Sequence, residues 1–452
     1  MSISEFIDSR RSELLQRLFS LLSIPSVSSQ SEHKHDMLRC AERWRDLLAD
    51  AGMHASVLPT AGNPVVFSQI EVDVNAPTIL VYGHYDVMPV EPLSEWELPP
   101  FEPQLLDGYI RARGADDDKG QSFMHYAALL YLIENGLLKH NVKILLEGEE
   151  EISSPSLGSF LESHQELLKS DVILVSDTSM LGADKPSITT GLRGLAYLQI
   201  DVKSCNRDLH SGIFGGAIAN PINVLCSLIG RLQDIESGKI LVPGFYDDVD
   251  ELSAEEKRLI AQIPFDSAEY LEGIGAKELH GESGYSTLER TGVRPTFDVC
   301  GIWGGYTGEG AKTVLPAEAH AKISTRLVPH QNHDKIALMI EDYLHNIAPD
   351  YVTVSVTSLH GASSYVCPID MPAYRSAERA YERVFGLRPL PVRRGGSIGV
   401  VAMFEDILHT KSILMGFGLE SDAIHSPNEN FPLEMWEKGI KTIVAFHEEF
   451  DK

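Results

Sequence analysis

The apolar run Thr78-Ile-Leu-Val-Tyr82 is followed directly by Gly83-His84-Tyr85-Asp86. A short run of this kind, rich in branched aliphatic residues and bounded by a glycine, is typical of a buried strand. In an open α/β sheet, ligands bind beyond the carboxyl ends of the strands, so His84 and Asp86 fall where a site would lie. This stretch therefore predicts a strand that leads into a polar site.

Three further apolar runs also end in polar side chains. Val142–Leu146 precedes Glu147, Glu149, Glu150 and Glu151, Asp171–Val175 precedes Ser176 and Asp177, and Ser412–Gly416 precedes a loop with Glu420, Asp422 and His425. Helical patterns alternate with these runs over residues 3–22, 35–51, 121–135 and 157–168. Short buried strands that alternate with helices favour an α/β fold with a mainly parallel sheet.

The pattern changes between residues 192 and 364, where strand-like segments dominate around two helical stretches near 221–232 and 334–348. Such a mixture indicates a smaller α+β domain. The α/β pattern then returns with a helical stretch over 373–385. We therefore expect a catalytic domain formed by residues 1–191 and 365–452, interrupted by an inserted α+β domain over residues 192–364.

The composition narrows the class of function. The 452 residues include 38 Lys and Arg against 65 Asp and Glu, so the formal net charge of 38 − 65 = −27 argues against nucleic acid or an anionic membrane as a partner. The five cysteines form no close pair, which indicates neither a disulfide framework nor a cysteine zinc site. The first residues lack the apolar core of a signal peptide. We expect a cytoplasmic protein.

The polar strand ends together suggest a metal centre. Taken singly, each histidine or acidic run is more often a solvated surface feature, but massed carboxylates repel one another and need cations. Histidine and carboxylate ligands without cysteine suit Zn²⁺, Mn²⁺ or Co²⁺. The cluster, which includes Asp116-Asp-Asp118, is too rich for one ion, so a two-metal site bridged by a carboxylate is favoured. Such sites activate a bridging water and polarise a carbonyl.

Sequence blocks over nearly the whole chain carry a family resemblance. They are Gly83-His-Tyr-Asp-Val-Met-Pro89, Arg113-Gly-Ala-Asp-Asp-Asp-Lys-Gly120, Glu147-Gly-Glu-Glu-Glu151, Ser176-Asp177, Asp208-Leu-His-Ser-Gly212, Lys312-Thr-Val-Leu-Pro316, Ser324-Thr-Arg-Leu-Val-Pro329, Gly395-Gly-Ser397 and His425-Ser-Pro-Asn428. The chain resembles the dinuclear metallopeptidase family of carnosinase-type dipeptidases, carboxypeptidase G, aminoacylases and succinyl-diaminopimelate desuccinylase. The spacing is most similar to the branch of cytosolic nonspecific dipeptidases.

The resemblance implies two divalent metal ions per subunit, Zn²⁺ or Mn²⁺, with Co²⁺ also suitable. Its ligand set is His84 and Asp177 for one ion, Glu151 and His425 for the other, and Asp117 as the bridge. Asp117 takes the bridging role as the first Asp of Asp-Asp-Lys-Gly, although Asp116 is an extra acid beside it. The resemblance also implies a cis peptide between Asp117 and Asp118, and it makes Asp86 the residue that orients the imidazole of His84.

The resemblance further implies that metal-bound hydroxide cleaves the amide bond of dipeptides or short peptides with a free carboxylate. Glu150 would be the general base, which takes a proton from the water and delivers it to the leaving amine. The neighbouring Glu149 is interpreted as a solvated loop acid. The alternatives are an N-acyl amino acid deacylase on the same scaffold and a non-catalytic metal-binding or peptide-binding protein.

The inserted domain would be the family's lid and dimerisation domain, so the resemblance implies a homodimer. There His210 would stabilise the oxyanion in the neighbouring subunit's site. Arg326 would bind the substrate carboxylate with its guanidinium fork. The remaining residues of that pocket would be Thr313, His360, Gly396 and Ser397.

One motif indicates a different kind of enzyme, a serine hydrolase. Gly395-Gly-Ser397-Ile-Gly399 matches the G-x-S-x-G nucleophile elbow of serine hydrolases. The elbow requires a buried strand directly before it, and Leu390-Pro-Val-Arg-Arg394 is a poor strand by its composition. We therefore expect the metal centre, and not Ser397, to carry the chemistry.

Overall fold

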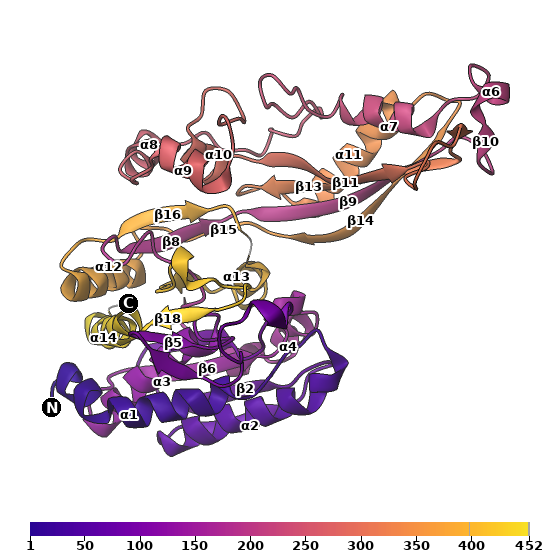
Figure 1. The fold of residues 1–452 in the computed structure, drawn as a ribbon. Helices are drawn as coiled ribbons and strands as arrows, with labels where there is room; N and C mark the ends of the chain where they lie inside the picture. The colour runs from indigo at the N-terminus through magenta and orange to yellow at the C-terminus, as the bar shows by residue number, and fades with distance from the viewer. Residues whose placement is uncertain (397, 451–452) are drawn as a thin grey trace. The chain divides into compact units, whose positions relative to one another are not determined.

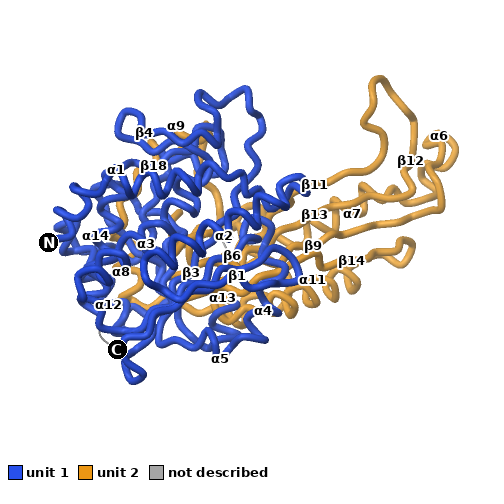
Figure 2. The backbone as a smooth tube through the Cα atoms, turned by 90° about the horizontal axis from the view of Figure 1, so that it is seen from below, with its two compact units in different colours: residues 1–190, 367–392, 403–452 blue, residues 191–366, 393–402 orange. Residues whose placement is uncertain are grey.

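The computed structural model describes residues 1–396 and 398–450 (Figure 1). The chain divides into two compact units, coloured separately in Figure 2. The first unit comprises residues 1–190, 367–392 and the chain from residue 403 on, and the second comprises residues 191–366 and 393–402. Each unit has its own sheet and helices and is described in turn.

The first unit contains the central parallel strands β6 (Asn141–Glu147), β3 (Thr78–His84), β7 (Val172–Val175) and β17 (Ser412–Leu414), in that spatial order. These strands are almost wholly buried, as continuous apolar runs require. Antiparallel β1 (His54–Leu58) and β2 (Val65–Ile70) extend the sheet beyond β6, and β8 (Ser187–Leu192) pairs antiparallel with β17. The predicted α/β fold with a mainly parallel sheet is confirmed.

Helices of the first unit pack on this sheet and on one another. They are α1 (Ile3–Leu22), α2 (Lys34–Asp50), α3 (Lys119–Glu134), α4 (Leu157–Ser163), α5 (Gln165–Leu168), α12 (Pro372–Phe385) and α14 (Leu433–Glu449). Helix α1 starts with a capping box, in which Ser2 and Glu5 satisfy each other's backbone N–H groups. Helix α3 is buried along most of its length, because β3, α1 and α14 all contact it. A small sheet of β4 (Gln104–Leu106), β5 (Tyr109–Arg111) and β18 (Asn430–Pro432) completes the unit.

The second unit contains an antiparallel sheet in the order β11 (Thr296–Gly304), β13 (Glu318–Leu327), β9 (Gly194–Lys203) and β14 (Thr353–Ala362). Helices α7 (Pro221–Ile229) and α11 (His333–Ile347) bury their apolar side chains against it. The shorter elements are β10 (Leu209–His210), β12 (Val314–Leu315), β15 (Tyr365–Val366), α6 (Ser211–Phe214), α8 (Ala254–Ile260), α9 (Ser267–Ile274) and α10 (Thr287–Gly292). On β9 the residues alternate between buried and half-buried, so one face of the sheet forms the core.

The segment 393–402 groups with the second unit, although it follows the residue at which we expected the chain to return to the catalytic domain. Two side chains explain this. The Nε atom of Arg193 donates to the carbonyl of Gly395 at 3.2 Å, and Nη2 of Arg393 lies 3.0 Å from Oε1 of Glu256. Strand β16 (Leu390–Arg394), which pairs with β8, and helix α13 (Gly399–Met403) lie at the two ends of this segment.

Among the described residues, no helix combines the length and the apolar character needed to cross a lipid bilayer.

Two buried histidines of the first unit are in direct contact. Nε2 of His140 lies 2.6 Å from Nδ1 of His447, which lies on α14, and the two residues are only 3% and 4% exposed. Burial lowers the pKa of His140 to about 4 and that of His447 well below its ordinary value. Two neutral rings can make this contact, with an N–H of one imidazole donating to the ring nitrogen of the other, and burial disfavours a charge on either ring.

We expect acid to destabilise the fold through this pair. His140 binds a proton near pH 6.5 when unfolded but only near pH 4 when folded, and the pKa of His447 is lowered in the same direction. The contribution of the pair to stability is therefore complete above pH 6.5 and is lost as the pH falls toward 4. The variant His140→Gln keeps a donor toward His447 and cannot ionise. It should reduce the loss of unfolding free energy between pH 7 and pH 5 by about 1 to 2 kcal/mol, measured by urea unfolding. His330→Gln, at an exposed position, is the control, and equal pH slopes for His140→Gln and wild type would contradict the expectation.

Candidate active site

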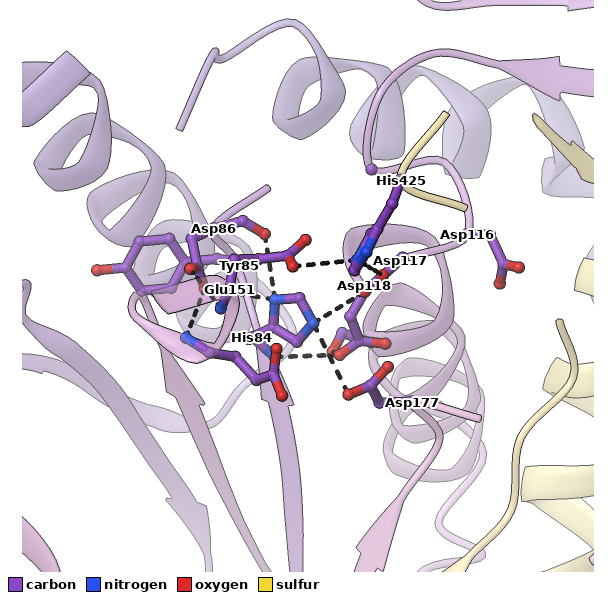
Figure 3. Close-up of polar contacts among 12 residues, drawn as sticks. His84, Tyr85, Asp86, Asp116, Asp117, Asp118, Glu151, Asp177 and His425 are labelled. Atoms are coloured by element: carbon purple, nitrogen blue, oxygen red, sulfur yellow. Dashed lines mark hydrogen bonds and ion pairs between the residues drawn. The ribbon is translucent and has the colours of Figure 1, made fainter. Parts of the chain in front are cut away.

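His84, the last residue of β3, is fully buried and held at both ring nitrogens. Its Nδ1 lies 3.1 Å from the main-chain carbonyl of Asp86 and 3.3 Å from the Asp86 carboxylate. Its Nε2 lies 3.0 Å from Oδ1 of Asp117 and 3.8 Å from Oδ2 of Asp177 (Figure 3). Nδ1 is therefore held by the chain that follows β3, and Nε2 is directed at two carboxylates.

The Asp86 carboxylate connects His84 to the acidic segment after β6. Its Oδ1 accepts the backbone N–H of Glu150 at 3.2 Å, and its Oδ2 accepts the backbone N–H of Glu151 at 3.1 Å. These two glutamates form the short 3-10 helix η3 (Glu150–Ile152). Asp86 thus orients an imidazole and fixes the backbone of two acidic residues at the same time, as supporting carboxylates in metal sites commonly do.

Two groups of potential metal ligands share one carboxylate. The first ligand group is His84, Asp117 and Asp177, and the second ligand group is Asp117, Glu151 and His425. Within each group the ligand atoms lie within 4.8 Å of one another. His425 Nε2 lies 2.9 Å from Oδ2 of Asp117 and 3.1 Å from Oε2 of Glu151 (Figure 3). Asp117 therefore offers one oxygen to each group, which is the position of a bridging ligand.

Asp117 stands between two other aspartates with different surroundings. The peptide between Asp117 and Asp118 is cis, as the family resemblance implied. Asp118 accepts the backbone N–H of His84 at 3.0 Å and the hydroxyl of Ser122 at 2.6 Å, so it supports β3. Figure 3 shows the side chain of Asp116 directed away from the two imidazoles. Burial and the charge of Asp422 raise the pKa of Asp116 well above its ordinary value.

The electrostatics of the two ligand groups favour added positive charge. Burial raises the pKa of Asp177 well above its ordinary value, and it also raises that of Glu151. Although burial opposes ionisation of His84, its hydrogen bonds to Asp117 and Asp86 raise its pKa well above 6.5, and the same kind of contacts raise the pKa of His425 to about 10. These shifts have a common cause, the excess of negative charge around the two imidazoles, and a divalent ion in each group would neutralise that charge.

The donor set fits a pair of divalent metal ions. Each group combines imidazole nitrogen with carboxylate oxygen, which Zn²⁺, Mn²⁺ and Co²⁺ accept. The shared carboxylate and the Asp86 support add the features expected of a dinuclear site. Glu150 belongs to neither group; burial and the neighbouring carboxylates raise its pKa to about 7, so it is a candidate for proton transfer.

Glu429 is a supporting residue that the sequence reasoning missed. Its buried carboxylate accepts the backbone N–H groups of Asp116 and Asp117, both at 3.1 Å, and that of Gly114 at 2.9 Å. It also pairs with Nη1 of Arg113 at 2.7 Å. Glu429 comes only four residues after His425, but its partners lie more than 300 residues away in sequence, so no local pattern indicates its role.

Replacing Glu429 with Gln should weaken metal binding by roughly 10- to 100-fold, the usual effect of losing a residue that holds a ligand in place. The amide group of glutamine brings N–H donors to a position where three backbone N–H groups need acceptors. Metal affinity, measured by competition with a chromogenic chelator for Zn²⁺ or Mn²⁺, tests this. Glu434→Gln on α14 is the matched control because Glu434 is exposed. An affinity equal to that of the control would show that the loop around Asp117 holds its shape without this carboxylate.

The interpretation of Glu149 as a solvated acid is wrong. Glu149 is buried, and its carboxylate accepts the backbone N–H groups of Asn63 at 2.9 Å and Ser156 at 3.1 Å. It therefore joins the loop before β2 to the loop before α4. Both contacts are structural and lie outside the two ligand groups.

The other predicted site residues belong to the second unit. His210 is exposed at the end of β10, where its Nδ1 accepts the N–H of Gly212 at 2.9 Å, and Thr313 lies next to it, since the Thr313 carbonyl accepts the N–H of Ser211. Arg326 lies on β13 and His360 on β14, where the His360 ring stacks on Tyr197 with 5.0 Å between ring centres. Gly396 is exposed, and Ser397 lies outside the described residues.

The surroundings of the serine-hydrolase motif differ in part from the expectation. A strand does precede it, since β16 covers Leu390–Arg394, but only Val392 of that strand is buried, so the buried strand that the elbow requires is not formed there. The pairing of β16 with β8 gives the segment an extended conformation despite Pro391 and the two arginines. His425, a histidine that follows the motif in the chain, is already engaged by Asp117 and Glu151.

Comparison with known proteins agrees with this geometry. Residues 80–449 match the family model described as peptidase family M20/M25/M40. The chain is 32% identical to a Cys-Gly metallodipeptidase of Schizosaccharomyces pombe, over 98% of this chain and 96% of the relative. It is 31% identical to the Beta-Ala-His dipeptidase of Homo sapiens, over 98% of this chain and 91% of the relative.

A solved structure also resembles the whole chain. It is an M20 family metallo-carboxypeptidase from Sulfolobus solfataricus, with a TM-score of 0.86 and 31% identity, over 97% of this chain and 99% of that one. The similarity therefore extends through both units and includes the four strand ends that carry the two ligand groups.

Proposed function

The chain belongs to the peptidase family M20/M25/M40, and from this membership we propose that it is a two-metal hydrolase that cleaves the amide bond of dipeptides or short peptides with a free carboxylate. The observation that carries the proposal is the pair of ligand groups that share Asp117, with Glu150 beside them. The relatives named as dipeptidases supply the substrate class.

In this proposal each side chain has a distinct task. Bound ions supply an activated water and polarise the scissile carbonyl. The Glu150 carboxylate takes a proton from the attacking water and passes it to the nitrogen of the leaving amine. Asp86 keeps the His84 ring in place and holds the backbone of Glu150, so that the base does not need to be ordered when the substrate binds.

We further propose Zn²⁺ or Mn²⁺ as the resident ions, with Co²⁺ as a functional substitute. The imidazole and carboxylate donors support all three, because none of the ligands is a thiolate that would select a softer metal. We also propose a cytoplasmic location, where thiols stay reduced, because the five cysteines form no close pair in the sequence.

The second unit is proposed to be the lid and dimerisation domain. His210 would stabilise the oxyanion from the partner subunit of a homodimer, and Arg326 would bind the substrate carboxylate, aided by Thr313, His360, Gly396 and Ser397. The exposure of His210 supports a role toward another molecule. His210→Ala should lower kcat roughly 100-fold, as expected for the loss of one oxyanion donor, with the metal content unchanged. Wild-type turnover of this variant would refute the role.

The function is tested by removing the metals with a chelator and restoring Zn²⁺, Mn²⁺ or Co²⁺ separately. A mixed panel of dipeptides and N-acyl amino acids is then followed by mass spectrometry. Metal-dependent cleavage of dipeptides is the expected result and also ranks the metals. Cleavage of N-acyl amino acids alone would change the assignment to a deacylase, and activity that survives complete metal removal would refute the two-metal mechanism.

A further inference from the structure

Arg193, which joins β8 to β9, is a nearly buried arginine of the second unit that no step above uses. It is only 9% exposed. Its Nε donates to the carbonyl of Gly395 at 3.2 Å, and its Nη1 donates to the carbonyls of Arg290 and Arg294, both at 3.3 Å. The guanidinium therefore ties together two chain segments that are about 100 residues apart in sequence.

The surroundings of Arg193 are positively charged. Burial and the positive charge of Arg326 together lower its pKa to about 10, while Asp298 acts in the opposite direction. Arg326 is near because Leu195, two residues after Arg193, pairs directly with it across β9 and β13. A buried guanidinium beside a second one is costly, and an anion offsets that cost.

Arg193 holds the carbonyl of Gly395, and the next residue, Gly396, belongs to the proposed substrate pocket. At Gly395 a Cβ atom would lie 2.6 Å from the carbonyl oxygen of Thr291 and 2.7 Å from Nη2 of Arg193, so only glycine permits this approach. At Gly396 a Cβ atom would meet nothing within 4 Å. Arg193 thus fixes one glycine firmly, and the next residue borders open space.

We propose that Arg193 is a positioning residue that holds Gly395–Gly396 in place and, together with Arg326, selects substrates with a free C-terminal carboxylate. This inference rests on the proposed function, because it concerns how the same substrate is bound. Arg326 contacts the carboxylate, whereas Arg193 acts through the glycine segment and through its charge. It follows that losing Arg193 weakens the recognition of the carboxylate more than it slows the chemical step.

The test uses the full-length metal-loaded enzyme and the most rapidly cleaved dipeptide of the panel. Arg193→Met should raise KM for that dipeptide about 10-fold, with kcat within about 3-fold of wild type, since one lost interaction with a charged group is worth about that much. The same dipeptide as its C-terminal amide serves as a competitive inhibitor, and its inhibition constant should not change. Arg193→Lys, which keeps the charge and loses the planar fork, should raise KM by an intermediate factor.

Arg231→Met, the loss of an exposed arginine in the same unit, is the matched control and should behave as wild type. An unchanged KM in Arg193→Met, or an equal weakening of acid and amide, would overturn the proposal, because a purely structural role would not distinguish the two ligands. If Arg193→Met does not fold, the same criteria are applied to Arg193→Lys. Failure of the wild-type enzyme to cleave any dipeptide would instead refute the proposed function, and this inference with it.

Discussion

Replacing Glu150 with Gln should lower kcat for dipeptide cleavage roughly 1,000-fold, the range that a positioned proton-transfer group supplies. Glutamine has almost the same shape but cannot accept a proton from the attacking water. Glu150 lies outside both ligand groups, and its backbone N–H is held by Asp86 in either variant, so both ions should remain bound. Steady-state kinetics combined with elemental analysis of the metal content tests both expectations.

The neighbouring residue provides a matched control. Glu149→Gln makes the same chemical change one residue away, and the remaining carbonyl oxygen can still accept a backbone N–H from Asn63 or Ser156. We expect it to retain kcat within about 3-fold while losing some stability, as for a buried hydrogen-bonded group. A Glu150→Gln enzyme with kcat near that of this control would mean that another group moves the proton.

Much of the fold follows from the sequence because its central strands are buried on both faces. Ile79–Tyr82 and Ile144–Leu146 are continuous apolar runs, which are typical of interior strands. Strand β16 was missed because Pro391 and two arginines dilute its apolar pattern, and its extended shape comes from pairing with β8. Pairing of this kind depends on residues that are distant in sequence, and no local pattern shows it.

In the candidate site, too, some residues could be predicted from local sequence patterns, whereas others depend on contacts between residues distant in sequence. Four of the five residues predicted as ligands end or follow strands whose carboxyl ends meet at one edge of the sheet, and the fifth, Asp117, lies just before α3. The supporting residues are different. Glu149 and Glu429 look like surface acids in the sequence, and only the backbone N–H groups that approach them from remote segments make them buried acceptors. Sequence reasoning finds residues that carry chemistry more readily than residues that hold them in place.

Replacing Asp117 with Asn should remove the bridging charge from both ligand groups. Because Asp117 offers Oδ1 toward His84 and Oδ2 toward His425, a single substitution weakens both ion sites together. We expect loss of both ions on dialysis and a decrease in kcat/KM of roughly 1,000-fold or more, since the ions supply several kcal/mol of transition-state stabilisation. Metal content by elemental analysis and activity after adding back Zn²⁺ or Mn²⁺ provide the measurement.

Asp116→Asn is the control for this experiment, and it also tests the register of the three aspartates. Burial and the charge of Asp422 raise the pKa of Asp116 well above its ordinary value, so this position disfavours a negative charge, and asparagine there should leave both ions bound. The two variants change neighbouring residues, but only Asp117→Asn should remove the negative charge of the carboxylate that both ligand groups share. Retention of both ions in Asp117→Asn together with their loss in Asp116→Asn would assign the bridge to Asp116, and the two ligand groups would then have to be rebuilt around that carboxylate.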